Sequence, residues 1–222
     1  MRSSVLPVPD ACQTAWAAHI REVFSQIGLP ADTLADHLVT SISIYCKKFH
    51  PQGLQAHDLN LLIARACCAV GERTAAAQVL ESMPAHRRHV ERWLEILSEL
   101  HHFPQLLPYF SRGIIRPADW AGAQLDRMWT LDFGRLMLSD ADRHEMALYR
   151  SIRALIEKMS VFWEATRGEG ILGLKELAAL NLATRSKLTS TEALLEYMTD
   201  LLTQQKTARN WISVPVLLNL DL

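Results

Sequence analysis

The sequence predicts a mainly α-helical protein, in which an N-terminal layer of αα-hairpins precedes an α+β half with a small two- or three-stranded sheet and one long helix. Five or more segments repeat apolar residues at steps of three and four, the period of an amphipathic helix. Only two segments alternate apolar and polar residues, the period of a half-buried strand. With 222 residues, such a chain buries about 70% of its extended surface. We therefore expect about two thirds helix.

Five helices are predicted in the first part of the chain. Glycines at Gly28 and Gly71 stand where a helix C-terminus favours positive φ, and Pro51 and Pro84 cannot continue a helix. Apolar stripes between these residues predict helices over 10–27, 32–49, the segment from Gly53 to Gly71, 73–83 and 85–101.

The third and fourth of these helices form a predicted hairpin. Six small and apolar residues resemble one helix pair of a tetratricopeptide repeat in order and spacing: Ile63, Ala64, Cys67, Gly71, Ala76 and Leu80. A shift by the repeat length of about 34 residues finds no second copy, so no array is predicted. A helical hairpin closed by a glycine turn explains the same residues.

The composition of the sequence changes after the fifth predicted helix. Pro104, Pro108 and Gly113 fall close together and predict an irregular connection. The predicted organisation is a helical region over 1–103, an irregular connection over 104–127 and a long-helix plus small-sheet region over 128–222, packed as one unit.

Two strands are predicted in the second half. Residues 129–133 alternate before Gly134, where we expect a bulge. Residues 212–220 alternate too, and Pro215 favours an edge position because it has no N–H to donate. We expect the two strands to pair and to bury Ile212, Val214, Val216 and Leu218. An unpaired edge would remain, and such an edge invites a strand from a second copy or another partner.

The rest of the second half is predicted to be helical. A stripe that begins at Met146 continues to Gly168 and predicts a helix of roughly 25 residues. Residues 171–182 are also predicted to be helical, and the capping-box pattern at 189–192 opens a further helix. The glycines at 168, 170 and 173 follow a helix rather than a strand, so we interpret them as a turn and not as a dinucleotide-binding loop.

Composition excludes several classes of protein. A net charge of −1 makes nucleic-acid binding an unexpected role. Because no long apolar stretch is present, we expect no membrane segment and a cytoplasmic location. The cysteines lack metal-site spacing and are predicted to be buried reduced thiols, so no metal or cofactor is predicted: Cys12, Cys46, Cys67 and Cys68.

The densest ionisable cluster precedes the predicted long helix. Its candidate catalytic residues are Asp140, Asp142, His144 and Glu145, with Arg150 and Arg153 as a possible anion clamp. Carboxylates could hold a hard cation, and His144 could act in acid–base chemistry. Aspartates at this position also serve as helix caps.

A second candidate site is basic. Arg87, Arg88 and Arg92 lie beside His86 and His89 and could contact an anion or an acidic partner. A solvated helix face accounts for the same residues, and neighbouring arginines disfavour a metal on the histidines.

The sequence holds no complete catalytic motif of the common hydrolase, nucleotide-binding or zinc-protease types. We therefore predict a non-enzymatic helical interaction scaffold or adaptor, whose partner is another protein or a second copy in a homodimer. The alternative is a metal- or small-molecule-dependent enzyme with its site around 140–153.

Overall fold

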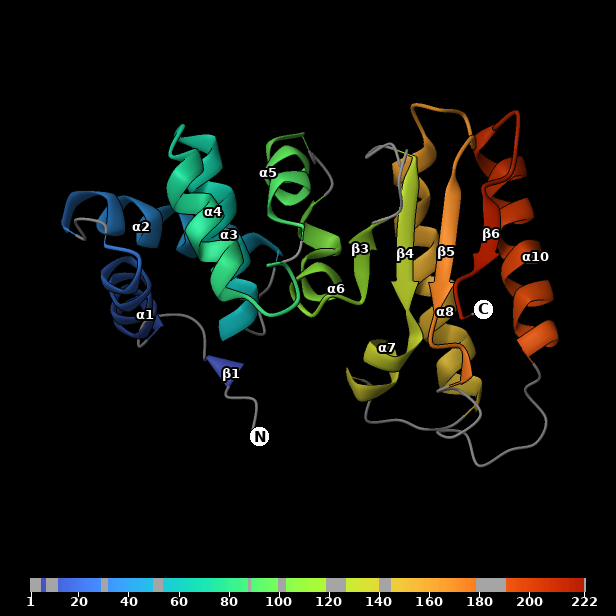
Figure 1. Ribbon diagram of the computed structural model, residues 1–222, viewed down its shortest axis with the longest axis horizontal. Helices are drawn as coiled ribbons and strands as arrows, with labels where there is room; N and C mark the ends of the chain where they lie inside the picture. The colour runs from blue at the N-terminus through green and yellow to red at the C-terminus, as the bar shows by residue number, and fades with distance from the viewer. Residues whose placement is uncertain are drawn as a thin grey trace. The chain divides into compact units, whose positions relative to one another are not determined.

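The structure is a computed structural model that describes residues 5–6, 12–28, 32–49, 54–87, 89–99, 103–118, 127–139, 145–178 and 191–221. The chain divides into two compact units, Met1–Arg112 and Gly113–Leu222, shown in Figure 1. The first unit is helical and the second combines a small sheet with helices, so the predicted fold class is confirmed. Among the described helices, none has both the length and the apolar character needed to cross a membrane.

The first unit consists of helical hairpins. Helix α1 packs on α2 and helix α3 packs on α4, as the apolar stripes predict. Gly71 closes the second hairpin with φ +89°, a conformation that favours glycine. The helices are α1 (Cys12–Gln26), α2 (Asp32–Phe49), α3 (Ala56–Ala69), α4 (Arg73–Ser82), α5 (Val90–Glu99) and α6 (Leu107–Ser111).

Short strands and aromatic contacts complete this unit. Strands β1 (Val5–Leu6) and β2 (Leu54–Gln55) pair antiparallel. Helix α5 packs against α3 and α4, and α6 packs against α3. The rings of Trp93 and Phe110 meet edge to face at 5.4 Å, which places aromatic side chains of α5 and α6 in one core.

Two expectations for the end of this region are wrong. Helix α5 begins at Val90 rather than at 85, because the N–H groups of His86 and Arg87 both donate to the carbonyl of Met83 in a turn. The segment predicted to be an irregular connection holds a 3₁₀ turn (Phe103–Gln105), α6 and a strand. Pro108 fits there because proline is tolerated in the first turn of a helix.

The second unit is built on a four-stranded sheet of order β3-β4-β5-β6. Strand β3 runs antiparallel to β4, and the other two pairs are parallel. The strands are β3 (Ile115–Pro117), β4 (Met128–Asp132), β5 (Ile171–Lys175) and β6 (Val216–Asn219). The sheet thus has more strands than predicted.

The prediction of a helix over 171–182 is wrong, since this segment begins with strand β5. Its two buried leucines, Leu172 and Leu174, alternate with Gly173 in the strand period. This segment pairs with β4 on one side and with β6 on the other, and such tertiary pairing decides the conformation of short apolar runs.

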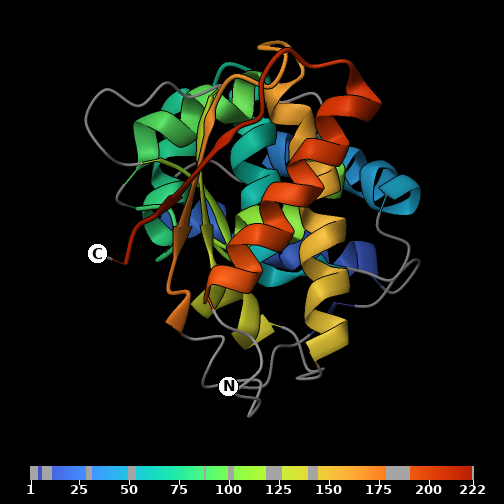
Figure 2. The same ribbon diagram turned by 90° about the vertical axis from the view of Figure 1, so that its right-hand side faces the viewer.

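Two helices cover one face of this sheet. Figures 1 and 2 show α8 (Glu145–Met159) and α10 (Thr191–Arg209) on the same side of the strands. Each helix connects two neighbouring parallel strands. A 3₁₀ segment, Ser160–Trp163, follows α8 and stacks Phe162 on Trp129 at 4.0 Å. The face of β4 that carries Trp129 and Leu131 is therefore the helix-covered face.

The predicted helix of roughly 25 residues is shorter than expected. Helix α8 has 15 residues, and the chain continues as a 3₁₀ helix from Ser160. The longest helix in the described part of the chain is α10, with 19 residues. Gly134 is not a bulge but part of α7 (Phe133–Ser139).

The last strand pairs differently from the prediction. Strand β6 pairs with β5 and not with β4. Val216 and Leu218 lie on the face opposite the helices, where they are 55% and 39% exposed, and Ile212 is 67% exposed. The prediction that Ile212, Val216 and Leu218 are buried is therefore wrong, since side chains of successive strand residues point to opposite faces.

Candidate functional site

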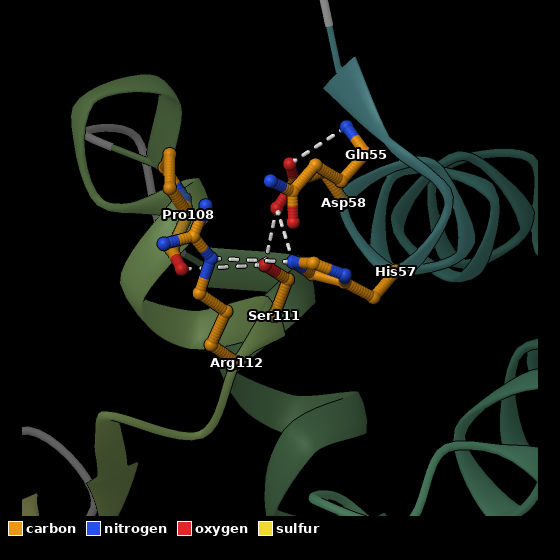
Figure 3. Close-up of polar contacts among 6 residues, drawn as sticks. All are labelled: Gln55, His57, Asp58, Pro108, Ser111 and Arg112. Atoms are coloured by element: carbon orange, nitrogen blue, oxygen red, sulfur yellow. Dashed lines mark hydrogen bonds and ion pairs between the residues drawn. The ribbon is translucent and has the colours of Figure 1, made fainter. Parts of the chain in front are cut away.

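The first candidate site is a polar cluster at the start of α3 and the end of α6, formed by His57, Asp58, Ser111 and Arg112 and called here the α3–α6 cluster (Figure 3). One carboxylate oxygen of Asp58, Oδ2, accepts a hydrogen bond from the backbone N–H of Gln55 at 3.0 Å. Asp58 thus satisfies a backbone donor at the helix N-terminus, as acidic residues in a first turn often do.

The other oxygen of Asp58 connects the two helices. Its Oδ1 accepts a hydrogen bond from the hydroxyl of Ser111, and it lies 3.5 Å from Nε2 of His57. Asp58 and Ser111 are both buried. Because an unpaired polar group is costly to bury, this hydrogen bond holds α6 against α3.

The imidazole of His57 is an acceptor in this cluster. Arg112 Nε donates a hydrogen bond to His57 Nε2 at 3.3 Å, and because a guanidinium can only donate, Nε2 carries no proton. Burial lowers the pKa of His57 below 6.5; the Asp58 carboxylate opposes this shift and the Arg112 guanidinium adds to it. The hydrogen bond from Arg112 and the lowered pKa both favour the neutral ring with its proton on Nδ1.

The cluster holds the residue types of a serine-hydrolase triad in the wrong order. In a triad, the imidazole lies between the hydroxyl and the carboxylate, so that it can take the hydroxyl proton. Here the hydroxyl of Ser111 donates to Asp58 instead, and the side chain is buried away from any substrate. The arrangement therefore supports helix packing rather than nucleophilic catalysis.

The second candidate site is a buried ion-pair cluster at the end of β4. Asp132 accepts from Arg116 Nη2 at 2.9 Å and from the backbone N–H of Arg135 at 3.0 Å, and Arg135 Nε lies 3.5 Å away. Open α/β sheets bind ligands at the carboxyl ends of parallel strands. In this sheet, that end of β4 is occupied by a carboxylate that caps α7 and pairs with two arginines.

Two buried polar atoms in or beside this cluster take no part in its hydrogen bonds. Within the described residues, Thr130 Oγ1 and Arg116 Nε are buried without a hydrogen-bond partner. Thr130 lies directly opposite Arg116 in the β3–β4 register. Asp132 is not among the site residues predicted from the sequence, although an aspartate between a strand and a helix is a capping signal.

The third candidate site is the outer edge of β6. Sheet order places β6 at the end of the sheet, so that no described strand pairs with its outer side. Its exposed residues are apolar: Val216 and Leu218 in the strand, and Ile212 just before it. Exposed apolar residues beside a free strand edge are typical of a polypeptide-binding surface.

Backbone hydrogen bonds show which groups of β6 are free. Val216 donates its N–H to the carbonyl of Gly170, the residue just before β5, at 2.9 Å, and Leu220 donates to the carbonyl of Leu174 in β5 at 2.8 Å. Because successive residues of a strand direct their backbone groups to opposite sides, those of Leu217 and Asn219 point to the outer edge. The edge therefore offers two N–H and two C=O groups for pairing.

Of the residues predicted to form a site around 140–153, only Glu145, Arg150 and Arg153 lie within the described part of the chain. Asp140, Asp142 and His144 lie outside the described residues, and Glu145 is the first residue of α8. Arg150 and Arg153 are exposed on that helix, and Arg153 Nε donates to Glu157 at 3.1 Å one turn later. The site at 140–153 stays a prediction.

The basic candidates lie before and within α5. Arg87 is exposed, Arg92 is half-buried, and Arg88 lies outside the described residues. His86 does not belong to a solvated face, since its ring is fully buried and lies 4.6 Å from that of Trp93. Among the described residues, no three His, Cys, Asp or Glu side chains are grouped to hold a metal ion.

Comparison with known proteins finds no match to the chain among protein-family models, curated proteins or solved structures.

Proposed function

We propose that this protein is an interaction module that binds another polypeptide chain through the outer edge of β6. The observation that carries the proposal is the exposure of Val216 and Leu218, 55% and 39%, on an edge strand whose Leu217 and Asn219 backbone groups point outward. An added strand gains affinity from such backbone groups and specificity from the alternate side chains.

The other two candidate sites support structure instead of chemistry. The hydroxyl of Ser111 is bound to Asp58, and Asp132 is neutralised by Arg116 and Arg135. Buried polar groups that satisfy each other hold elements together but leave little for a substrate to bind. The free edge of β6 is therefore the surface that favours an interaction role.

Affinity purification of the full chain tests the proposal. A tagged copy is co-expressed with an untagged copy in the source organism, so that a second copy also counts as a partner. We expect a stoichiometric partner with the wild type that is lost with Leu218→Lys, because a charge replaces an apolar contact. Met146→Lys is the matched control, since Met146 is 67% exposed and apolar on α8.

Two outcomes would contradict an interaction role for this edge. One is a tagged chain that is repeatedly recovered alone. The other is a set of partners that Leu218→Lys and Met146→Lys leave equally unchanged.

A further inference from the structure

We propose that the partner of β6 is the β6 strand of a second copy of this chain, paired antiparallel about a two-fold axis beside Leu218. This inference rests on the proposed function, because it names the occupant of the same edge. A two-fold interface requires that one surface be complementary to itself, and the edge of β6 meets this requirement in its backbone and in its side chains.

The backbone groups of the edge are symmetric about Leu218. Leu217 and Asn219 point outward on either side of it, while Val216 and Leu220 are bound to β5. In an antiparallel pair centred on Leu218, Leu217 of one copy stands opposite Asn219 of the other. Each such pair exchanges two N–H···O=C hydrogen bonds, so all outward groups of both strands are satisfied.

The residues at the two ends of the exposed edge, Pro215 and Asp221, are also compatible with this register. Pro215 has no N–H, and the N–H of Asp221 already donates to the side chain of Asn219 at 3.0 Å. Pro215 and Asp221 each lie three residues from Leu218, so they face each other across the same axis. Neither residue therefore presents an unsatisfied donor where the two-fold pair ends, and the pairing has a defined length.

The exposed side chains also pair with themselves. Leu218 of one copy stands opposite Leu218 of the other, and Val216 stands opposite the half-buried Leu220. All three lie on the face opposite the helices, so pairing joins them in one apolar stripe. Cross-strand apolar pairs of this kind stabilise a sheet, and the net charge of −1 opposes self-association little.

The other edge of the sheet, formed by β3, offers fewer backbone donors for pairing. Ala118 donates to Met128 of β4 at 3.1 Å, so the neighbouring residue Pro117 points outward on β3. That position has no N–H, which leaves the three-residue strand with Ile115 as its outward donor. Proline at an edge position opposes strand addition, so we place the interface on β6.

Sedimentation of the full chain at tens of micromolar tests the association. We expect a mass of twice 25.1 kDa. Leu218→Lys places two ammonium groups opposite each other across the axis and should weaken association by about tenfold or more, whereas Met146→Lys should leave it unchanged. A monomer, or a dimer that is equally stable in both variants, would overturn the proposal.

Disulfide crosslinking tests the register. In the proposed pair, Leu218→Cys places two thiols on directly opposed residues, about 4.5 Å apart at Cα, which a disulfide can bridge. Val216→Cys is the matched control, because Val216 would stand opposite Leu220 and far from its own copy. We expect a crosslinked dimer from Leu218→Cys, above the wild-type background. Equal or stronger crosslinking of Val216→Cys would overturn the register.

These results separate the inference from the proposed function. A monomeric wild type overturns the homodimer, but it leaves the edge able to bind a different chain. The proposed function fails when the chain is repeatedly recovered alone, or when partner recovery does not depend on Leu218.

Discussion

The carbonyl oxygen of Ser213 lies 2.1 Å from the position that a β-carbon on Gly168 would occupy. Gly168 also has φ +90°. The residue before it, Arg167, accepts hydrogen bonds at its carbonyl from the N–H groups of Ile212 and Ser213, at 2.9 and 3.3 Å. This close approach directs the chain from α10 into β6. The position of the proposed interface strand therefore depends on a glycine more than 40 residues earlier in the sequence.

We expect Gly168→Ala to lower the free energy of unfolding by about 3 kcal/mol or more, because the methyl group adds a steric clash to the cost of positive φ. Gly71→Ala is the matched control. Gly71 has φ +89° and no atom within 4 Å of an added β-carbon, so it should lose only about 1–2 kcal/mol. Urea unfolding measures both values. Equal losses would show that the contact with Ser213 is not close.

Asp132→Ala should destabilise the protein by about 3–5 kcal/mol, because it leaves the mostly buried guanidinium of Arg116 without its partner. The control is Asp36→Ala, which breaks an exposed ion pair with Arg21 at 2.7 Å and should cost about 1 kcal/mol or less. Chemical denaturation compares the two variants. A loss for Asp132→Ala no larger than that for Asp36→Ala would contradict the buried cluster at the end of β4.

The α3–α6 cluster predicts a dependence of stability on pH. The pKa of His57 is lowered from 6.5 in the folded chain, so the unfolded chain binds the proton first as the pH falls. The free energy of unfolding therefore decreases as the pH falls through 6.5, until the folded-state pKa is reached. Other histidines also titrate here, so the measurement is the difference between the wild type and His57→Gln. An unchanged pH profile in that variant would contradict the neutral, accepting imidazole.

Cys67 should resist thiol reagents in the folded protein. Its side chain is fully buried, and burial raises the pKa of the thiol to about 11, so little reactive thiolate forms. The half-buried neighbour Cys68 is the internal comparison. Mass spectrometry after alkylation should find Cys67 labelled only once the chain is unfolded in urea. Labelling of Cys67 as fast as Cys68 in the folded chain would contradict this prediction.

The sequence predicts most helices of the first unit because the apolar stripes end at glycine or proline residues that terminate a helix. The stripe that ends at Gly71, for example, predicts both α3 and the turn to α4. Strand β5 is not predictable in the same way, because its few apolar residues fit a helix as well as a strand, and pairing with β4 and β6 decides between them. The period of two predicts strands at β4 and β6, but no local period reveals which of the four strands pair with each other.

The candidate sites are predictable only in part. Pro215 and the apolar alternation predict an edge strand near the C-terminus. They do not predict which face of this strand is exposed, since that depends on the pairing with β5. Ser111 and Asp58 are 53 residues apart, and neither stands in a motif. Only the packing of α6 on α3 brings them together, so spacing in the sequence gives no signal for this cluster.

Amide hydrogen exchange of β6, followed by NMR in the full chain as its concentration is raised, tests the central claim most directly. The N–H groups of Val216 and Leu220 donate to the carbonyls of Gly170 and Leu174, so these two amides should be protected at every concentration. The amides of Leu217 and Asn219 point outward, and we expect them to exchange freely in dilute solution and to become protected as copies associate. Free exchange of both amides in the associated protein would contradict an interface at this edge.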